Sequence, residues 1–130
     1  MRWLIAALLT FVLGTWLLGA PPPGRAVDAV ARAAITALGR GDAAAAYRLT
    51  DLDFRADCPL HRFAGSVQAR QERYRAVRVR AVHATPPRGL RVSATVVLDT
   101  PEGERVERWE FAREGSRWYV YENLQQCGNQ

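Results

Sequence analysis

The chain has 130 residues and a formal net charge of +5, and all 18 of its basic residues are arginine. This length allows one domain beyond an N-terminal apolar run, with a single core of moderate size. The charge suits a solvated surface or an anionic partner, and is too small to indicate a nucleic-acid-binding protein.

Residues 3–20, WLIAALLTFVLGTWLLGA, form an uncharged apolar run. As a helix this run is about 27 Å long, close to the hydrocarbon thickness of a bilayer. Arg2 and the α-amino group place positive charge before it, which favours a cytoplasmic N-terminus. We therefore predict a transmembrane anchor over residues 1–20, with the body of the chain outside the cytoplasm.

A cleaved signal peptide is the main alternative, and it would release a secreted protein. Leu18-Gly19-Ala20 resembles a cleavage site, but Pro21 follows directly and obstructs signal peptidase. A buried soluble helix is a third reading of the same run. Residues 21–25, PPPGR, are predicted to form a short, stiff linker before a domain over residues 26–130.

Apolar side chains recur at helical spacing from residue 27 to residue 38, which predicts an amphipathic helix. Gly39 ends this helix, and Asp42 is placed to cap a second helix over AAAAYRLT. Leu52 and Phe54 are expected to pack beneath the second helix. A third helix then begins at Cys58-Pro59, since proline suits a first helical turn.

After Tyr74 the apolar period changes to two, which is typical of strands. Turn sequences at residues 86–89, 100–103 and 114–116 separate four such runs. Three helices followed by a four-stranded antiparallel meander indicate an α+β fold.

Three motifs in this order look familiar: Gly-Asp-x-x-Ala-Ala-Tyr-x-Leu at residues 41–49, Asp-x-x-Phe-Arg at 51–55 and Arg-Trp-x-Val at 117–120. From residue 26 to 123 the chain resembles the nuclear transport factor 2-like superfamily, the cystatin-like α+β cone. It is most similar to small membrane-anchored or secreted domains of that superfamily in high-GC Gram-positive bacteria. The resemblance implies helices packed on a curved sheet around a cavity. It indicates a fold more than an activity, because this scaffold hosts isomerases, dehydratases, cyclases and non-enzymatic binders.

The only two cysteines are Cys58 and Cys127. They could form a disulfide, remain as buried thiols or supply half of a metal site, but a metal site would need more ligands than His61 and His83 provide. A disulfide is favoured if the compartment is oxidising. In the cone that the resemblance implies, this bond would tie the helical layer to the end of the sheet.

Catalysts of the resembling superfamily hold an acidic base and oxyanion donors inside the cone. His83 shares the strand parity of Val77 and Val79, which would point it inward, but a histidine at a strand end is more often a hydrogen-bonded rim residue than a base. Glu107 is a candidate acid at the cavity mouth. Arg108 and Glu110 are expected to form a solvated cross-strand pair on the opposite face.

The residues predicted to line the cavity are Tyr47, Phe63, His83, Glu107, Trp109, Phe111 and Trp118. No inward Asp–Tyr or Asp–His set matches the isomerase or dehydratase pattern, so no catalytic residue, metal or cofactor is predicted.

Five arginines cluster across the end of the third helix and the first strand: Arg70, Arg73, Arg75, Arg78 and Arg80. Such a run is usually a solvated face. The alternative is contact with anionic lipid head groups or with an acidic protein surface.

The function predicted from the sequence is a membrane-anchored, extracytoplasmic, non-catalytic binding or protein-interaction module, with an apolar cavity for a small ligand. One alternative is an accessory single-span subunit of a membrane protein complex. Another is a small isomerase or dehydratase that uses the cavity. Nucleic acid is not an expected partner outside the cytoplasm.

Overall fold

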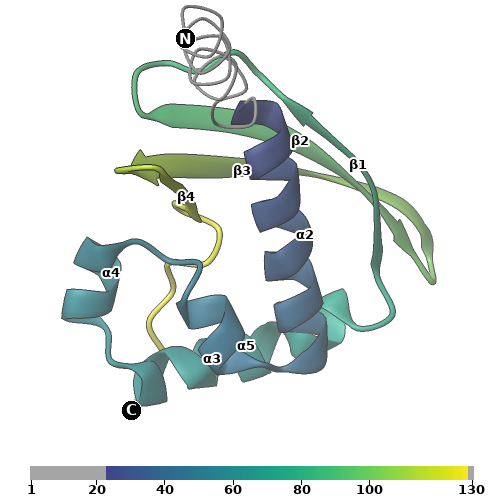
Figure 1. The fold of residues 1–130 in the computed structure, drawn as a ribbon. Coiled ribbons are helices and arrows are strands. Elements are labelled where there is room, and N and C mark those ends of the chain that lie inside the picture. The colour runs from purple at the N-terminus through teal and green to yellow at the C-terminus, as the bar shows by residue number, and fades with distance from the viewer. Residues whose placement is uncertain (1–22, 129–130) are drawn as a thin grey trace, which may run out of the picture.

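The computed structural model describes residues 23–128. Four helices come first: α2 (Pro23–Arg40), α3 (Ala43–Tyr47), α4 (Leu52–Asp57) and α5 (Leu60–Tyr74). They are followed by four strands: β1 (Arg78–Ala84), β2 (Arg91–Thr100), β3 (Gly103–Glu114) and β4 (Arg117–Val120). The strands form one antiparallel sheet in the order β1-β2-β3-β4. The sheet curls around α2 as a half-barrel (Figure 1), which confirms the α+β class and is compatible with a cone-like fold.

The N-terminal predictions fall largely outside this range. Among residues 23–128, no helix is both long enough and apolar enough to cross a bilayer. The anchor predicted over residues 1–20 lies outside the described residues and stays a prediction. Residues 23–25, assigned to a linker from the sequence, belong to α2; proline fits there because its missing N–H has no partner in a first helical turn.

The helical layer contains one helix more than the sequence analysis predicted. Asp42 caps α3 as expected, with its carboxylate accepting from Ala45 N at 3.0 Å. Asp51 acts in the same way: its carboxylate accepts from Phe54 N at 2.8 Å and starts α4. Leu52 therefore lies on a helix surface and is 60% exposed, so the prediction that it packs beneath α3 is wrong.

The core lies between α2 and the inner face of the sheet. The alternating face predicted for the second strand is confirmed, because Val92, Ala94, Val96 and Leu98 are all buried. The buried side of α2 consists of aliphatic side chains: Val27, Ala31, Ala34, Ile35, Ala37 and Leu38. Gly39 lets α2 lie close to α5. A Cβ atom at Gly39 would lie 2.6 Å from the carbonyl oxygen of Tyr74 in α5.

A bulge in β1 reverses the parity that the sequence suggested for this strand. Val79 pairs with Leu98, but Ala81 pairs with Val97, so the register shifts between Val79 and Ala81. Beyond the bulge, His83 lies opposite Thr95 and both are exposed. The prediction that His83 points inward is therefore wrong.

Cys58 and Cys127 lie at disulfide distance, with Cα atoms 5.8 Å apart. Cys58 precedes α5 and Cys127 follows β4, so the bond joins the helical layer to the segment after the sheet, as predicted. Two hydrogen bonds between Arg62 and Gly128 hold the same segment against α5, at 3.0 and 3.2 Å.

Candidate functional site

The predicted cavity-lining residues mostly form packed core. Phe63 and Phe111 have no exposed surface, and Trp109 is 1% exposed. Tyr47 is half-buried; its ring packs on Phe63 at 5.4 Å and its hydroxyl donates to the carbonyl oxygen of Cys58 at 2.7 Å. These contacts pack α3 against α5 within the helical layer. Trp118 is half-buried and packs on the edge of this core.

Glu107 stands at the border of the core, and its side chain is 12% exposed. Its carboxylate accepts hydrogen bonds from Tyr74 Oη at 3.0 Å and Trp109 Nε1 at 3.1 Å, both at Oε1, and from Arg73 Nη2 at 2.9 Å, at Oε2. Arg105 Nε lies 3.3 Å from Oε2 as an ion pair without hydrogen-bond geometry. We call Arg73, Tyr74, Arg105, Glu107 and Trp109 the Glu107 cluster.

The carboxylate oxygens of Glu107 are engaged by neighbouring protein groups. A carboxylate has about four acceptor positions, and four protein groups already surround this one. Burial raises the pKa of Tyr74, and the charge of Glu107 and its hydrogen bond raise it further, so Tyr74 stays a neutral donor at neutral pH. A general base must reach the proton that it removes. The oxygens of Glu107 face protein donors instead.

The five clustered arginines do not form one open basic surface. Arg70 is half-buried and donates to the carbonyl oxygen of Asn123 at 2.6 Å, and burial lowers its pKa from the ordinary value. Arg75 pairs with Glu72 at 2.9 Å, Arg80 pairs with Asp99 and Glu104, and Arg73 belongs to the Glu107 cluster. Within residues 23–128, Arg78 is the member of the set whose side chain makes no hydrogen bond or ion pair, and Arg70 is held by neutral groups alone. Contact of this face with an anionic surface stays a prediction.

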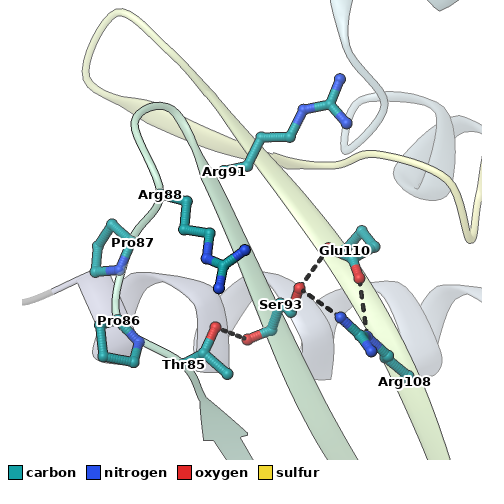
Figure 2. Close-up of a pocket in the computed structure, with 8 residues that line it drawn as sticks. All are labelled: Thr85, Pro86, Pro87, Arg88, Arg91, Ser93, Arg108 and Glu110. Atoms are coloured by element: carbon teal, nitrogen blue, oxygen red, sulfur yellow. Dashed lines mark hydrogen bonds and ion pairs between the residues drawn. The ribbon is translucent and has the colours of Figure 1, made fainter.

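A pocket of about 680 Å³ opens instead on the outer face of the sheet, under the turn between β1 and β2 (Figure 2). We call it the arginine pocket. Its lining residues are Thr85, Pro86, Pro87, Arg88, Arg91, Ser93, Arg108 and Glu110.

The pairing of β2 with β3 places Ser93, Arg108 and Glu110 side by side as the floor of the arginine pocket. Ser93 lies opposite Glu110 in the register of β2 and β3. Arg108 Nε donates to Glu110 Oε1 at 3.0 Å, and the two residues are neighbours along β3. The cross-strand arrangement predicted for Arg108 and Glu110 is therefore wrong, although their outward placement is right. Ser93 Oγ completes the floor by donating to Glu110 Oε2 at 2.7 Å.

Sequence reasoning missed this pocket. It identified the turn at residues 86–89 and the outward parity of Arg91, Arg108 and Glu110, but treated them separately. The missing information was the register of β2 against β3, which places residues far apart in the sequence beside one turn.

Comparisons with models of known protein families and with curated proteins find no match. A function is therefore proposed from the geometry of the domain.

A second, smaller pocket of about 380 Å³ lies beside the disulfide. Three aspartates line it: Asp51, Asp53 and Asp57. Asp51 is committed to capping α4 and also accepts from Gln125. No group of three or more His, Cys, Asp or Glu side chains in the described part of the chain is arranged to hold a metal ion.

Proposed function

We propose that this chain is a non-catalytic binding or protein-interaction module of the nuclear transport factor 2-like cone architecture, tethered outside the cytoplasm by residues 1–20. The observation that carries the proposal is the packing of Phe63, Trp109 and Phe111 into the interior, with Glu107 closed off by the donors around it. An enzyme working inside the cone needs an acid or base that substrate can reach. In this chain the interior has the composition and burial of a core, so a ligand is met at the surface.

The cone assignment is supported by the order of elements and by the curled sheet around α2. The extracytoplasmic location is supported by the paired cysteines, because disulfides persist in oxidising compartments and are rare in the cytosol. The apolar run at residues 3–20 supports the same location independently.

Xenon binding tests whether the interior can hold a ligand, since apolar cavities take up xenon or benzene. In methyl NMR spectra of the full chain in detergent micelles, xenon should cause no saturable shifts at Val67, Val96 or Leu98. A Phe63→Ala variant, which removes a fully buried ring, should bind xenon and is the positive control. Saturable shifts in the wild-type chain would contradict the filled interior and would favour a ligand inside the cone.

Alkylation of the two cysteines tests whether the domain lies outside the cytoplasm. The intact mass of protein taken from intact membranes should show alkylated cysteines only after reduction, on a full-length chain. A mass near residues 21–130 would instead indicate a secreted form after signal cleavage. Labelling of Cys58 and Cys127 without reduction would contradict an extracytoplasmic domain.

A further inference from the structure

We propose that the arginine pocket binds a phosphate monoester group, carried by a small polar molecule or by a lipid head group. The inference rests on the proposed function, because it names the ligand of a module that binds at its surface. It concerns a face of the sheet that none of the described helices covers (Figure 1).

The charge of the pocket is unbalanced. Three arginines, Arg88, Arg91 and Arg108, and one acid, Glu110, line the pocket. Figure 2 shows the guanidinium of Arg91 directed away from the floor, so Arg88 and Arg108 are the two cations that face it, against one carboxylate. Glu110 is already engaged by Arg108 and Ser93. Among residues 23–128, no hydrogen bond or ion pair holds the side chain of Arg88. Figure 2 shows its guanidinium directed toward the floor at Ser93.

The backbone that carries Arg88 is fixed before any ligand arrives. Arg88 and Arg91 exchange two backbone hydrogen bonds across the turn, at 2.8 and 3.1 Å, and Gly89 supplies the positive φ of 60° that the turn requires. Thr85 anchors the first arm of the turn by donating from both N and Oγ1 to the carbonyl oxygen of Ser93, at 2.8 and 3.0 Å. A ligand would therefore order little more than the arginine side chains themselves.

Arg91 is placed by a different contact. Its guanidinium lies 3.7 Å from the ring centroid of Tyr121, a stacking distance that holds the planar group while leaving its edge donors open. The pocket thus combines one cation directed toward its floor, Arg88, with one balanced by Glu110, Arg108, while Tyr121 holds the guanidinium of Arg91 away from the floor.

The chemistry of these groups favours a phosphate monoester. Guanidinium groups bind phosphate oxygens through paired hydrogen bonds. A monoester carries a charge of about −1.5 to −2 at pH 7 and three acceptor oxygens, which suits two guanidinium groups that each present several N–H donors. The volume of about 680 Å³ falls within the range of small-molecule sites, roughly 300–1,000 Å³, and leaves room for the body that bears the phosphate.

Two sources could supply this group. The turn between β1 and β2 and the N-terminal end of α2 both lie at the upper end of the molecule in Figure 1. The predicted anchor immediately precedes α2 in the sequence, so a lipid head group is within reach. A soluble phosphate ester would bind through the same contacts.

The test is a titration of the full chain, in nonionic detergent micelles, followed by NMR of the arginine Nε–Hε groups. One arm adds glycerol 1-phosphate, and the other adds phosphatidic acid to the micelles, with phosphatidylcholine as the neutral control. Saturable shifts of the Arg88 and Arg108 signals are expected. Shifts with glycerol 1-phosphate identify the group as accessible from solution, and shifts with phosphatidic acid alone identify a lipid ligand.

Arg88→Gln should weaken binding about 10- to 100-fold, the effect of losing hydrogen bonds to a charged group. Arg88→Lys keeps the charge and should restore part of the affinity without the paired geometry. Arg78→Gln is the matched control, because it removes one exposed arginine outside the pocket and should leave affinity within about twofold. Unchanged methyl signals of the core would show that each variant folds.

The inference is overturned if neither probe produces saturable shifts, or if Arg78→Gln weakens binding as much as Arg88→Gln, since binding would then reflect diffuse charge. Failure here is distinguishable from failure of the proposed function. Xenon entry into the wild-type interior would contradict the proposed function and leave the arginine pocket titration unaffected.

Discussion

The hydroxyl of Tyr74, in the last turn of α5, donates to the carboxylate of Glu107 in β3 at 3.0 Å. This bond links the helical layer to the sheet at the border of the core. The ring of Tyr74 also meets that of Trp109 edge-on, with centroids 6.5 Å apart. Glu107 is thereby one of the contacts that hold the helical layer on the sheet.

Replacing Glu107 with glutamine should lower the free energy of unfolding by about 2 kcal/mol. The amide keeps one acceptor oxygen but turns an NH₂ group toward the donors of Tyr74, Trp109 or Arg73. Urea denaturation monitored by tryptophan fluorescence measures the change. Glu104→Gln is the control: it removes an equal charge from an exposed pair with Arg80 and should change stability little. Equal losses in the two variants would contradict a structural role for Glu107.

Tyr74 should make stability depend on alkaline pH. An unfolded tyrosine titrates near pH 10, and burial and Glu107 raise the pKa of folded Tyr74 above its ordinary value. The folded chain therefore holds this proton longer than the unfolded chain. Its contribution to stability is complete below about pH 10 and is lost as the pH rises through the folded pKa.

Urea denaturation between about pH 8 and pH 11 should accordingly show a decline that Tyr74→Phe reduces. The matched control is Tyr119→Phe, because the Tyr119 hydroxyl has no hydrogen-bond partner among the described residues and lies on the outer face of the sheet. A Tyr74→Phe profile as steep as that of the wild-type chain would show that Tyr74 is not the titrating group.

Replacing both Cys58 and Cys127 with serine should destabilise the domain strongly. The bond closes a loop with a sequence separation of 69, and the chain-entropy account assigns about 4 kcal/mol to a loop of this size. Thermal denaturation should show a lower Tm for the variant. Reductant should lower the Tm of the wild-type chain and leave that of the variant unchanged; equal Tm values for the variant and the oxidised wild-type chain would contradict the stabilising role.

Two helical glycines should respond in opposite directions to alanine. Gly39→Ala would place a methyl group against the carbonyl oxygen of Tyr74 and should cost about 1–3 kcal/mol as α2 and α5 move apart. Gly65→Ala meets no atom within 4 Å and should raise the free energy of unfolding by about 0.5–1 kcal/mol through helix propensity. Denaturant unfolding compares them, and a stabilising Gly39→Ala would contradict the close contact between these helices.

Periodicity alone was sufficient to predict most of the fold. The change from a helical period to a period of two located α2, α5 and the four strands, and the alternation in β2 identified its buried face. The predictions that were wrong concern features that depend on single residues and do not change the apolar periodicity. Asp51 starts a helix that moves Leu52 into solvent, and one extra residue in β1 turns His83 outward.

The site was less predictable because it depends on register and on pairing across the fold. Glu107 was identified as a candidate acid, but its partners in α5 could not be inferred from β3. The arginines of the first strand read as one basic face, yet Arg80 pairs with acids on β2 and β3. Arg88 and Arg108 line one pocket only because the turn after β1 lies beside the paired strands β2 and β3.

Hydrogen exchange of the Trp109 indole N–H tests the central claim of a closed interior most directly. This group is buried and donates to Glu107 at 3.1 Å, so it should exchange only through unfolding of the whole domain. The Trp118 indole, half-buried and without a hydrogen-bond partner in the described residues, should exchange orders of magnitude faster. If Trp109 exchanges as fast as Trp118 under native conditions, the interior is open to solvent, and an enzyme using Glu107 inside the cone becomes the better reading.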